Sequence, residues 1–160
     1  GLNSPITSSA GRIFDACSAI LGIRQFAGYE GQAAMELEFA SYGIHTDESF
    51  PFVVQANGII DWQSTILALL EDHNNHVPNG EISVKLHNTL AEIIVNVSQQ
   101  ANETKIVLTG GCFQNKTLTE HTIKRLLEEG FTPYWHRHIP PNDGGIALGQ
   151  IIASGRINQT

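Results

Sequence analysis

The sequence has few basic residues and few cysteines. Nine Lys and Arg side chains stand against 16 Asp and Glu, for a net charge of −7. Because binding along nucleic acid requires clustered Lys and Arg, this balance disfavours a broad nucleic-acid surface, but it does not exclude one nucleotide held by backbone amides. Cys17 and Cys112, the only cysteines, have no C-x-x-C or other metal spacing. Both lie among apolar residues, so we expect buried thiols in a reducing compartment rather than a disulfide.

Long apolar runs are also missing. No stretch approaches the roughly 20 residues of a membrane-spanning helix, and the first residues lack the basic and apolar regions of a secretion signal. They are instead typical of the interior of a longer chain. With 41% hydrophobic and 16% charged residues, the composition favours a folded core. We expect a soluble, cytoplasmic domain, or one lobe of a larger protein.

Helical periodicity is clear near the N-terminus. Apolar spacing predicts a helix over 10–21 that ends at Gly22, and composition predicts another over 32–40. Arg12 and Asp15 lie three residues apart on the first helix, close enough to pair. An exposed pair of this kind contributes little to stability. The alternative is that both side chains face a ligand cleft.

The middle of the chain contains a hairpin pattern and two histidines. The expected elements are strands over 52–54 and 59–62 around Asn57-Gly58, a helix over 62–70, a polar loop over 72–80 and a long amphipathic helix over 82–97. Asn-Gly is typical of a two-residue hairpin turn. His73 and His76 have a spacing that could serve a metal, but a flexible loop would give them no fixed geometry.

The stretch 105–115 (KIVLTGGCFQN) joins a strand, a glycine turn and a helix start. Its short run of β-branched residues predicts a strand buried on both faces. Gly110 and Gly111 would let backbone N–H groups approach a phosphate or sugar without Cβ atoms in the way. The alternative is a tight connection in which the glycines only satisfy the backbone. The pattern matches neither G-x-G-x-x-G nor the P-loop with its lysine.

A second loop completes this pattern. The strand of the first stretch, the helix after it and a second strand over 131–136 predict a parallel β-α-β unit. The second loop follows this unit, in the stretch 139–150 (IPPNDGGIALGQ). Asp143 is either an N-cap of the next helix, a role open to Asn142 as well, or a carboxylate that faces a metal or a metal–phosphate pair. Both loops follow parallel strands at their carboxyl ends, where open α/β sheets bind ligands. His136 and His138 lie just before the second loop, and either could face the site.

Four blocks of the sequence resemble one known family. They are TSSAGRIFDACSAILGI, YEGQAAMELE, LTGGCFQN and PPNDGGIALGQ, in the family's order over about residues 3–153. Together they resemble the C-terminal part of HypF, the carbamoyltransferase of nickel–iron hydrogenase maturation. That family is related to the tRNA threonylcarbamoyladenosine-forming enzymes and to O-carbamoyltransferases. The resemblance implies an α/β fold: residues 1–160 as one lobe of an actin-like, sugar-kinase and Hsp70 (ribonuclease H-like) fold, a mixed sheet with flanking helices.

The resemblance also implies a function and its residues, although no catalytic residue is assigned. The expected reaction is transfer of a carbamoyl group from carbamoyl-adenylate to the C-terminal cysteine of a HypE-like partner. The expected cofactors are ATP and a divalent metal (zinc, iron or magnesium). The matching positions are Asp15 and Gly31 near the ribose, Gly110, Gly111 and Asn115 in the nucleotide loop, and Asp143 at the metal.

One part of the family's pattern is missing. The family's metal site also uses an H-x-x-x-H pair in an earlier lobe, which does not occur in this sequence. We therefore expect half a nucleotide cleft with an incomplete metal site, inactive without its upstream lobe, and no membrane or nucleic-acid partner. A non-catalytic nucleotide- or partner-binding module is an alternative. So is a relative of the tRNA-modifying enzymes, but their loops more typically contain A-A-N and T-D-N than CFQN and PNDGG.

Overall fold

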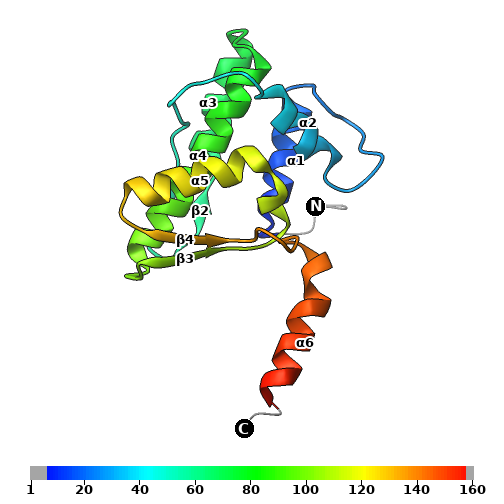
Figure 1. Cartoon of the computed structure of the whole chain (residues 1–160). Helices are drawn as coiled ribbons and strands as arrows, with labels where there is room; N and C mark the ends of the chain where they lie inside the picture. Colours follow the sequence, from blue (N-terminus) through cyan, green and yellow to red (C-terminus); the bar gives the residue numbers. More distant parts are fainter. Residues whose placement is uncertain (1–6, 158–160) are drawn as a thin grey trace. The chain divides into compact units, whose positions relative to one another are not determined.

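The computed structural model describes residues 7–157, with side chains through residue 155. Within it the chain divides after Thr89 into two compact units, which are described separately (Figure 1). The prediction of a single lobe over 1–160 stays a prediction. The first residues, predicted to be typical of a chain interior, lie outside the described part. None of the helices in the described part combines the length and apolar character needed to span a bilayer.

The first unit is mostly helical. Its elements are α1 (Ala10–Ile20), α2 (Gln32–Ala40), β1 (Val53–Val54), β2 (Ile60–Asp61), α3 (Gln63–Asn74) and the first half of α4 (Asn79–Gln100). The helices predicted over 10–21, 32–40 and 82–97 are confirmed. Gly22 follows α1 with φ 69°, a left-handed conformation that ends the helix as predicted.

Helix α4 supplies much of the first unit's core. Leu86 is fully buried, as are Leu37 of α2 and Phe14 of α1. The hydroxyl of Ser83 donates to the carbonyl oxygen of Leu37 at 2.6 Å. The ring of His87 lies 5.3 Å from the ring of Phe14. Apolar contacts and a satisfied buried hydroxyl therefore attach α4 to both earlier helices.

The predicted loop over 72–80 is wrong, because α3 continues to Asn74 and α4 begins at Asn79. A tertiary ion pair explains the longer helix. Asp72, in the last turn of α3, accepts from Lys85 at 2.7 Å, and Lys85 also pairs with Glu48 at 3.1 Å. Burial lowers the pKa of Lys85, but the hydrogen bonds that its ammonium donates to the two carboxylates outweigh this effect and raise the pKa overall.

The predicted hairpin forms, with a different turn. Val53 pairs with Asp61 and Val54 with Ile60 in antiparallel register. The backbone N–H of Gln55 donates to the Ile59 carbonyl and that of Gly58 to the Gln55 carbonyl, both at 2.8 Å. The loop therefore has three residues, with Gly58 at φ 80°, rather than the two expected for Asn-Gly. After the hairpin, Leu67 is 57% exposed and so is no core residue of α3.

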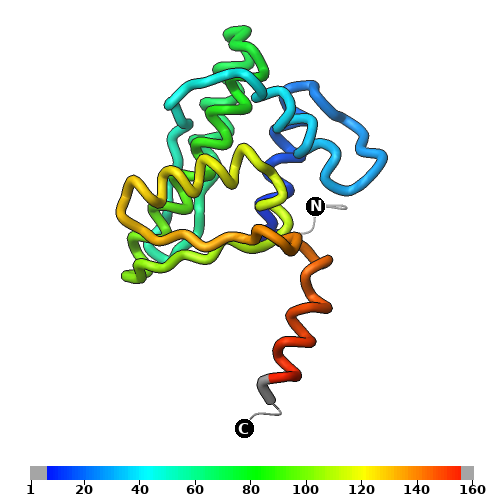
Figure 2. Tube along the Cα trace, viewed as in Figure 1, coloured from blue at the N-terminus to red at the C-terminus, as the bar shows by residue number. Residues whose placement is uncertain are grey.

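The second unit is the predicted β-α-β arrangement. After the second half of α4 come β3 (Lys105–Leu108), the 3-10 turn η1 (Gly111–Gln114), α5 (Lys116–Glu128), β4 (Thr132–Trp135), η2 (Asp143–Gly145) and α6 (Ile146–Ile157). Strands β3 and β4 run in parallel, from Lys105↔Thr132 to Leu108↔Trp135, and their traces lie side by side (Figure 2). The second unit's core is built around Val95, Leu108 and Leu126.

The prediction that β3 is buried on both faces is wrong. Val107 is 68% exposed, and its register partner Tyr134 is 48% exposed. Alternate residues of a strand point to opposite faces, so only the face that carries Leu108 packs against the core. Composition cannot distinguish a strand that is buried on both faces from one that is buried on a single face, because both kinds of strand are rich in β-branched residues.

The two cysteines, both within the described residues, are separate thiols. Cys17 is fully buried, as predicted, whereas Cys112 is only half-buried. Burial raises the pKa of Cys17 to about 12, which leaves about one part in 10⁴ as thiolate at pH 8. Iodoacetamide at pH 8 should therefore alkylate Cys112 much faster than Cys17, measured by mass spectrometry. Urea should make the two rates similar, and equal rates in the native protein would contradict the burial of Cys17.

Candidate functional site

The carboxyl edge of β3 and β4 brings the two predicted loops together. The hydroxyl of Thr109, one residue past β3, lies 3.1 Å from Nε2 of His136, one residue past β4. The N–H of Gly110 donates to the carbonyl oxygen of Pro141 at 2.9 Å. The prediction that both loops share one edge is therefore confirmed within the second unit.

Glycine is present at the two positions of the first loop for different structural reasons. Gly110 has φ 106° and ψ 160°, a region that essentially only glycine adopts, so the backbone itself requires this residue. Gly111 needs no positive φ, and a Cβ atom at this position would meet nothing within 4 Å. The open space beside Gly111 is where a ligand could approach the backbone.

Asn115 has a structural role. Its Oδ1 accepts a hydrogen bond from the N–H of Leu118 at 2.8 Å, which makes it the N-cap of α5. The hydroxyl of Thr119 donates to the carbonyl oxygen of Asn115 at 2.8 Å. The residue thus ends the glycine loop and begins the helix, and a contact with a nucleotide would be an additional role.

Asp143 is not the cap of the helix that follows. That role belongs to Asn142, whose Oδ1 accepts from the N–H of Gly144 at 3.0 Å. The Asp143 carboxylate is exposed and has no hydrogen-bond or ion-pair partner among the described residues. A metal at Asp143 would need ligands from elsewhere, because the described residues contain no group of three His, Cys, Asp or Glu suited to hold one.

The glycines after Asp143 accommodate the loop itself. A Cβ atom on Gly145 would lie 2.9 Å from the carbonyl oxygen of Pro140, and one on Gly144 would lie 3.1 Å from the ring of the same proline. The absence of a side chain at both glycines leaves room for a close neighbour. At these two positions the close neighbour is the chain's own proline loop.

Asp15 and Gly31 belong to the first unit, and each has a local role. Asp15 pairs with Arg12 at 2.9 Å, with 28% of the Asp15 side chain and 56% of the Arg12 side chain exposed. Gly31 has φ 79° and precedes α2, where its carbonyl oxygen accepts from the N–H of Met35 at 2.9 Å. Their placement near a ribose stays a prediction.

Sequence reasoning missed a groove on the second unit. It has a volume of about 750 Å³ and lies along α5, with Phe113, Ile123, Leu127 and Trp135 as its apolar lining. Leu127 in this lining is 58% exposed, whereas the neighbouring Leu126 is fully buried. The apolar spacing along α5 therefore marks two faces, and only the face with Leu126 is buried.

Comparison with known proteins decides the family. The model of a family described as carbamoyltransferase, Kae1-like domain, second subdomain matches residues 1–150. The chain belongs to the HypF carbamoyltransferase family. The HypF of Synechocystis sp. is 36% identical over 159 residues, which cover 98% of this chain and 20% of that protein. The chain thus spans about a fifth of this relative's length, and the resemblance inferred from the four sequence blocks is confirmed.

Two solved HypF structures agree with the fold. A full-length HypF in a phosphate- and nucleotide-bound form is 34% identical, with a TM-score of 0.86 over 96% of this chain and 25% of that chain. The HypF of T. kodakarensis is 24% identical, with a TM-score of 0.83 over 99% of this chain and 21% of that chain, and shows the fold alone. The predicted α/β class is confirmed, with the strands in two small sheets.

Proposed function

We propose that this chain is the nucleotide-binding lobe of a carbamoyltransferase that acts in hydrogenase maturation. The donor would be carbamoyl-adenylate, made from ATP, and the acceptor the C-terminal cysteine of a HypE-like partner in the cytoplasm. The observation that carries the proposal is the shared edge of the second unit, where the space beside Gly111 is open and Gly110 is bonded to the second loop. A HypF with this fold was crystallised with nucleotide and phosphate bound, which supports the same assignment.

The reaction explains what such an edge has to do. The acceptor thiolate attacks the carbamoyl carbon, a C–S bond forms, the bond from that carbon to the phosphate oxygen breaks, and AMP leaves with the electron pair. The adenylate must be held so that its phosphate is hydrogen-bonded and water is excluded. Backbone amides without a neighbouring Cβ atom, as at Gly111, suit the first requirement.

This chain alone does not supply all the ligands of the proposed divalent metal (zinc, iron or magnesium). Asp143 is the single proposed ligand, and its exposed carboxylate is compatible with that role. Because the described residues hold no set of three ligands, the remaining ligands would come from the upstream lobe. No step of the reaction is therefore assigned to a metal held by this chain.

A non-catalytic binding module is the second proposal. One observation favours it: Asp15, Gly31, Gly110 and Asn115 each have a local structural role that explains the residue without a ligand. Such a module would bind nucleotide or a partner but show no carbamoyl transfer after the upstream lobe is restored. A turnover assay on the longer chain separates the two proposals.

The test is a calorimetric titration of ATP with Mg²⁺ into the chain. Gly111→Val should weaken binding at least tenfold, because its side chain would fill the open space beside the backbone. Asp143→Ala should remove the dependence on the divalent metal. Gly155→Val is the control, because a side chain at Gly155 also meets nothing within 4 Å but lies at the far end of α6.

The outcome against the proposal is equally specific. Equal affinity of wild type and Gly111→Val would show that the glycine turn is only structural. If the isolated chain does not bind ATP, the titration is repeated on a longer chain that includes the upstream lobe. Absence of binding there as well would contradict the nucleotide-binding proposal.

A further inference from the structure

A hydroxyl and an imidazole meet at the edge that carries the two loops. Leu108 and Trp135 form the last register pair of β3 and β4, and the next residue of each strand is Thr109 and His136. Thr109 Oγ1 and His136 Nε2 are 3.1 Å apart, and both residues are exposed. The parallel register therefore places this pair directly before the glycine turn, open to a ligand.

The pair offers a hydrogen-bond donor in either neutral state of the imidazole. If Nε2 carries the proton, it donates to the Thr109 oxygen, and the threonine O–H can donate to a ligand. If Nδ1 carries the proton, the threonine donates to Nε2, and Nδ1–H of His136 can donate to a ligand. An acceptor such as a phosphate oxygen is the partner that suits both arrangements.

The surrounding loops provide few other side-chain donors of high strength. Residues 109–115 and 136–145 contain no lysine and a single arginine, Arg137. The guanidinium of Arg137 lies over the ring of Trp135, 4.4 Å from its centroid. A phosphate at this edge would therefore depend on backbone N–H groups and on uncharged or imidazole donors.

We propose that His136, together with Thr109, is a phosphate-contacting residue of this edge. The inference rests on the proposed function, because it assumes that the edge binds a nucleotide, and it adds a side chain that no sequence pattern assigned. Of the two histidines near the second loop, it selects His136 and leaves His138 without this role. The ligand class is a nucleoside phosphate, bound through its phosphate rather than its base.

The experiment uses the chain with ¹⁵N-labelled histidine and three probes: AMP, adenosine and inorganic phosphate. AMP and phosphate should shift the imidazole ¹⁵N resonances of His136 but not those of His138, and adenosine should leave both unchanged. By calorimetry His136→Ala should weaken AMP binding about tenfold, the loss expected for one hydrogen bond to a charged group. Thr109→Val should cause a similar loss, and His136→Gln should restore part of it.

Matched variants separate a contact from a structural effect. His138→Ala, two residues away and also exposed, should bind AMP as wild type does. If AMP binds to wild type and to His136→Ala with the same affinity, the role of His136 is overturned while the proposed function stands. If neither the chain nor a longer chain that includes the upstream lobe binds AMP or phosphate, both are overturned. If adenosine shifts the His136 resonances as much as AMP does, the histidine contacts the nucleoside, and the phosphate assignment is overturned.

Discussion

Replacing Gly80 with alanine should destabilise the first unit by about 3 kcal/mol, near the upper end for an overpacked site. Helix propensity alone would favour alanine by up to about 1 kcal/mol, because Gly80 lies in the first turn of α4. A Cβ atom at this position, however, would collide with Ile44 Cδ1 and with the carbonyl oxygen of Ala40. The isoleucine side chain can rotate away, but the backbone carbonyl at the end of α2 cannot. The collision therefore outweighs the gain in helix propensity, and the substitution lowers the stability.

Urea unfolding followed by circular dichroism measures this effect. Gly149→Ala is the control, because Gly149 lies within a helix, α6, where a Cβ atom meets nothing within 4 Å. The same substitution there should be neutral or stabilising by up to about 1 kcal/mol. A Gly80→Ala protein as stable as wild type would show that α4 and the end of α2 are not in close contact.

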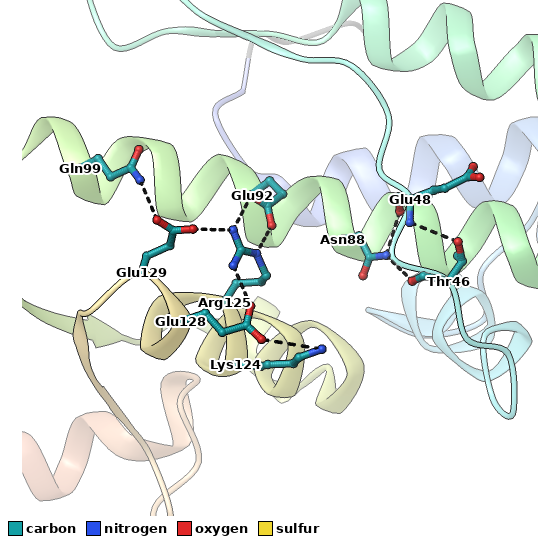
Figure 3. A network of polar contacts seen from close by, with 9 residues as sticks. All are labelled: Thr46, Glu48, Asn88, Glu92, Gln99, Lys124, Arg125, Glu128 and Glu129. Atoms are coloured by element: carbon teal, nitrogen blue, oxygen red, sulfur yellow. Dashed lines mark hydrogen bonds and ion pairs between the residues drawn. The ribbon is translucent and has the colours of Figure 1, made fainter.

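Removal of the Arg125 side chain should destabilise the second unit by about 2 kcal/mol, the range for hydrogen bonds to charged groups. Its guanidinium donates to Glu92 on α4, to Glu128 at the end of α5 at 2.7 Å, and to the following C-cap residue Glu129 at 2.9 Å (Figure 3). The hydrogen bond with Glu92, then those with Glu128 and Glu129, raise the pKa of Arg125. Without the arginine, three carboxylates would be left close together.

The adjacent lysine provides the control for Arg125→Ala. Lys124 has the same charge as Arg125 and lies on the same helix, but its side chain is 66% exposed and its ion pair with Glu128 is 3.9 Å long. Lys124→Ala should therefore change the free energy of unfolding by less than about 0.5 kcal/mol. Arg125→Lys should be intermediate, because lysine keeps the charge but not the planar fork of donors. Equal effects of Lys124→Ala and Arg125→Ala would contradict the network.

Much of the helical structure could be predicted because its causes are local. The spacing of apolar residues in α4 and the left-handed glycine after α1 are properties of the sequence itself. The end of α3 could not be predicted, since the polar residues after Leu70 are held in the helix by the ion pair between Asp72 and Lys85. The exposure of Val107 was missed for a similar reason, because whether another element covers the second face of a sheet is not a local property of the strand.

The candidate site divides in the same way. The glycine turn and the second loop were predictable from residue types, and so was their common edge, because parallel strands end on one side of a sheet. The choice between Asn142 and Asp143 as the cap required the structure. The contact between Thr109 and His136 required the register of β3 and β4, which no spacing in the sequence determines.

The continuity of α4 has a consequence for any attempt to separate the two units. The boundary after Thr89 falls inside this helix, with 11 residues (79–89) on one side and 11 (90–100) on the other. Isolated helices shorter than about 12–15 residues are marginal in water. Fission at the boundary would therefore leave each product with a frayed end in place of a core helix. The two units are joined by a helix rather than by a loop, so neither gene fission nor protein engineering could separate them without disrupting α4.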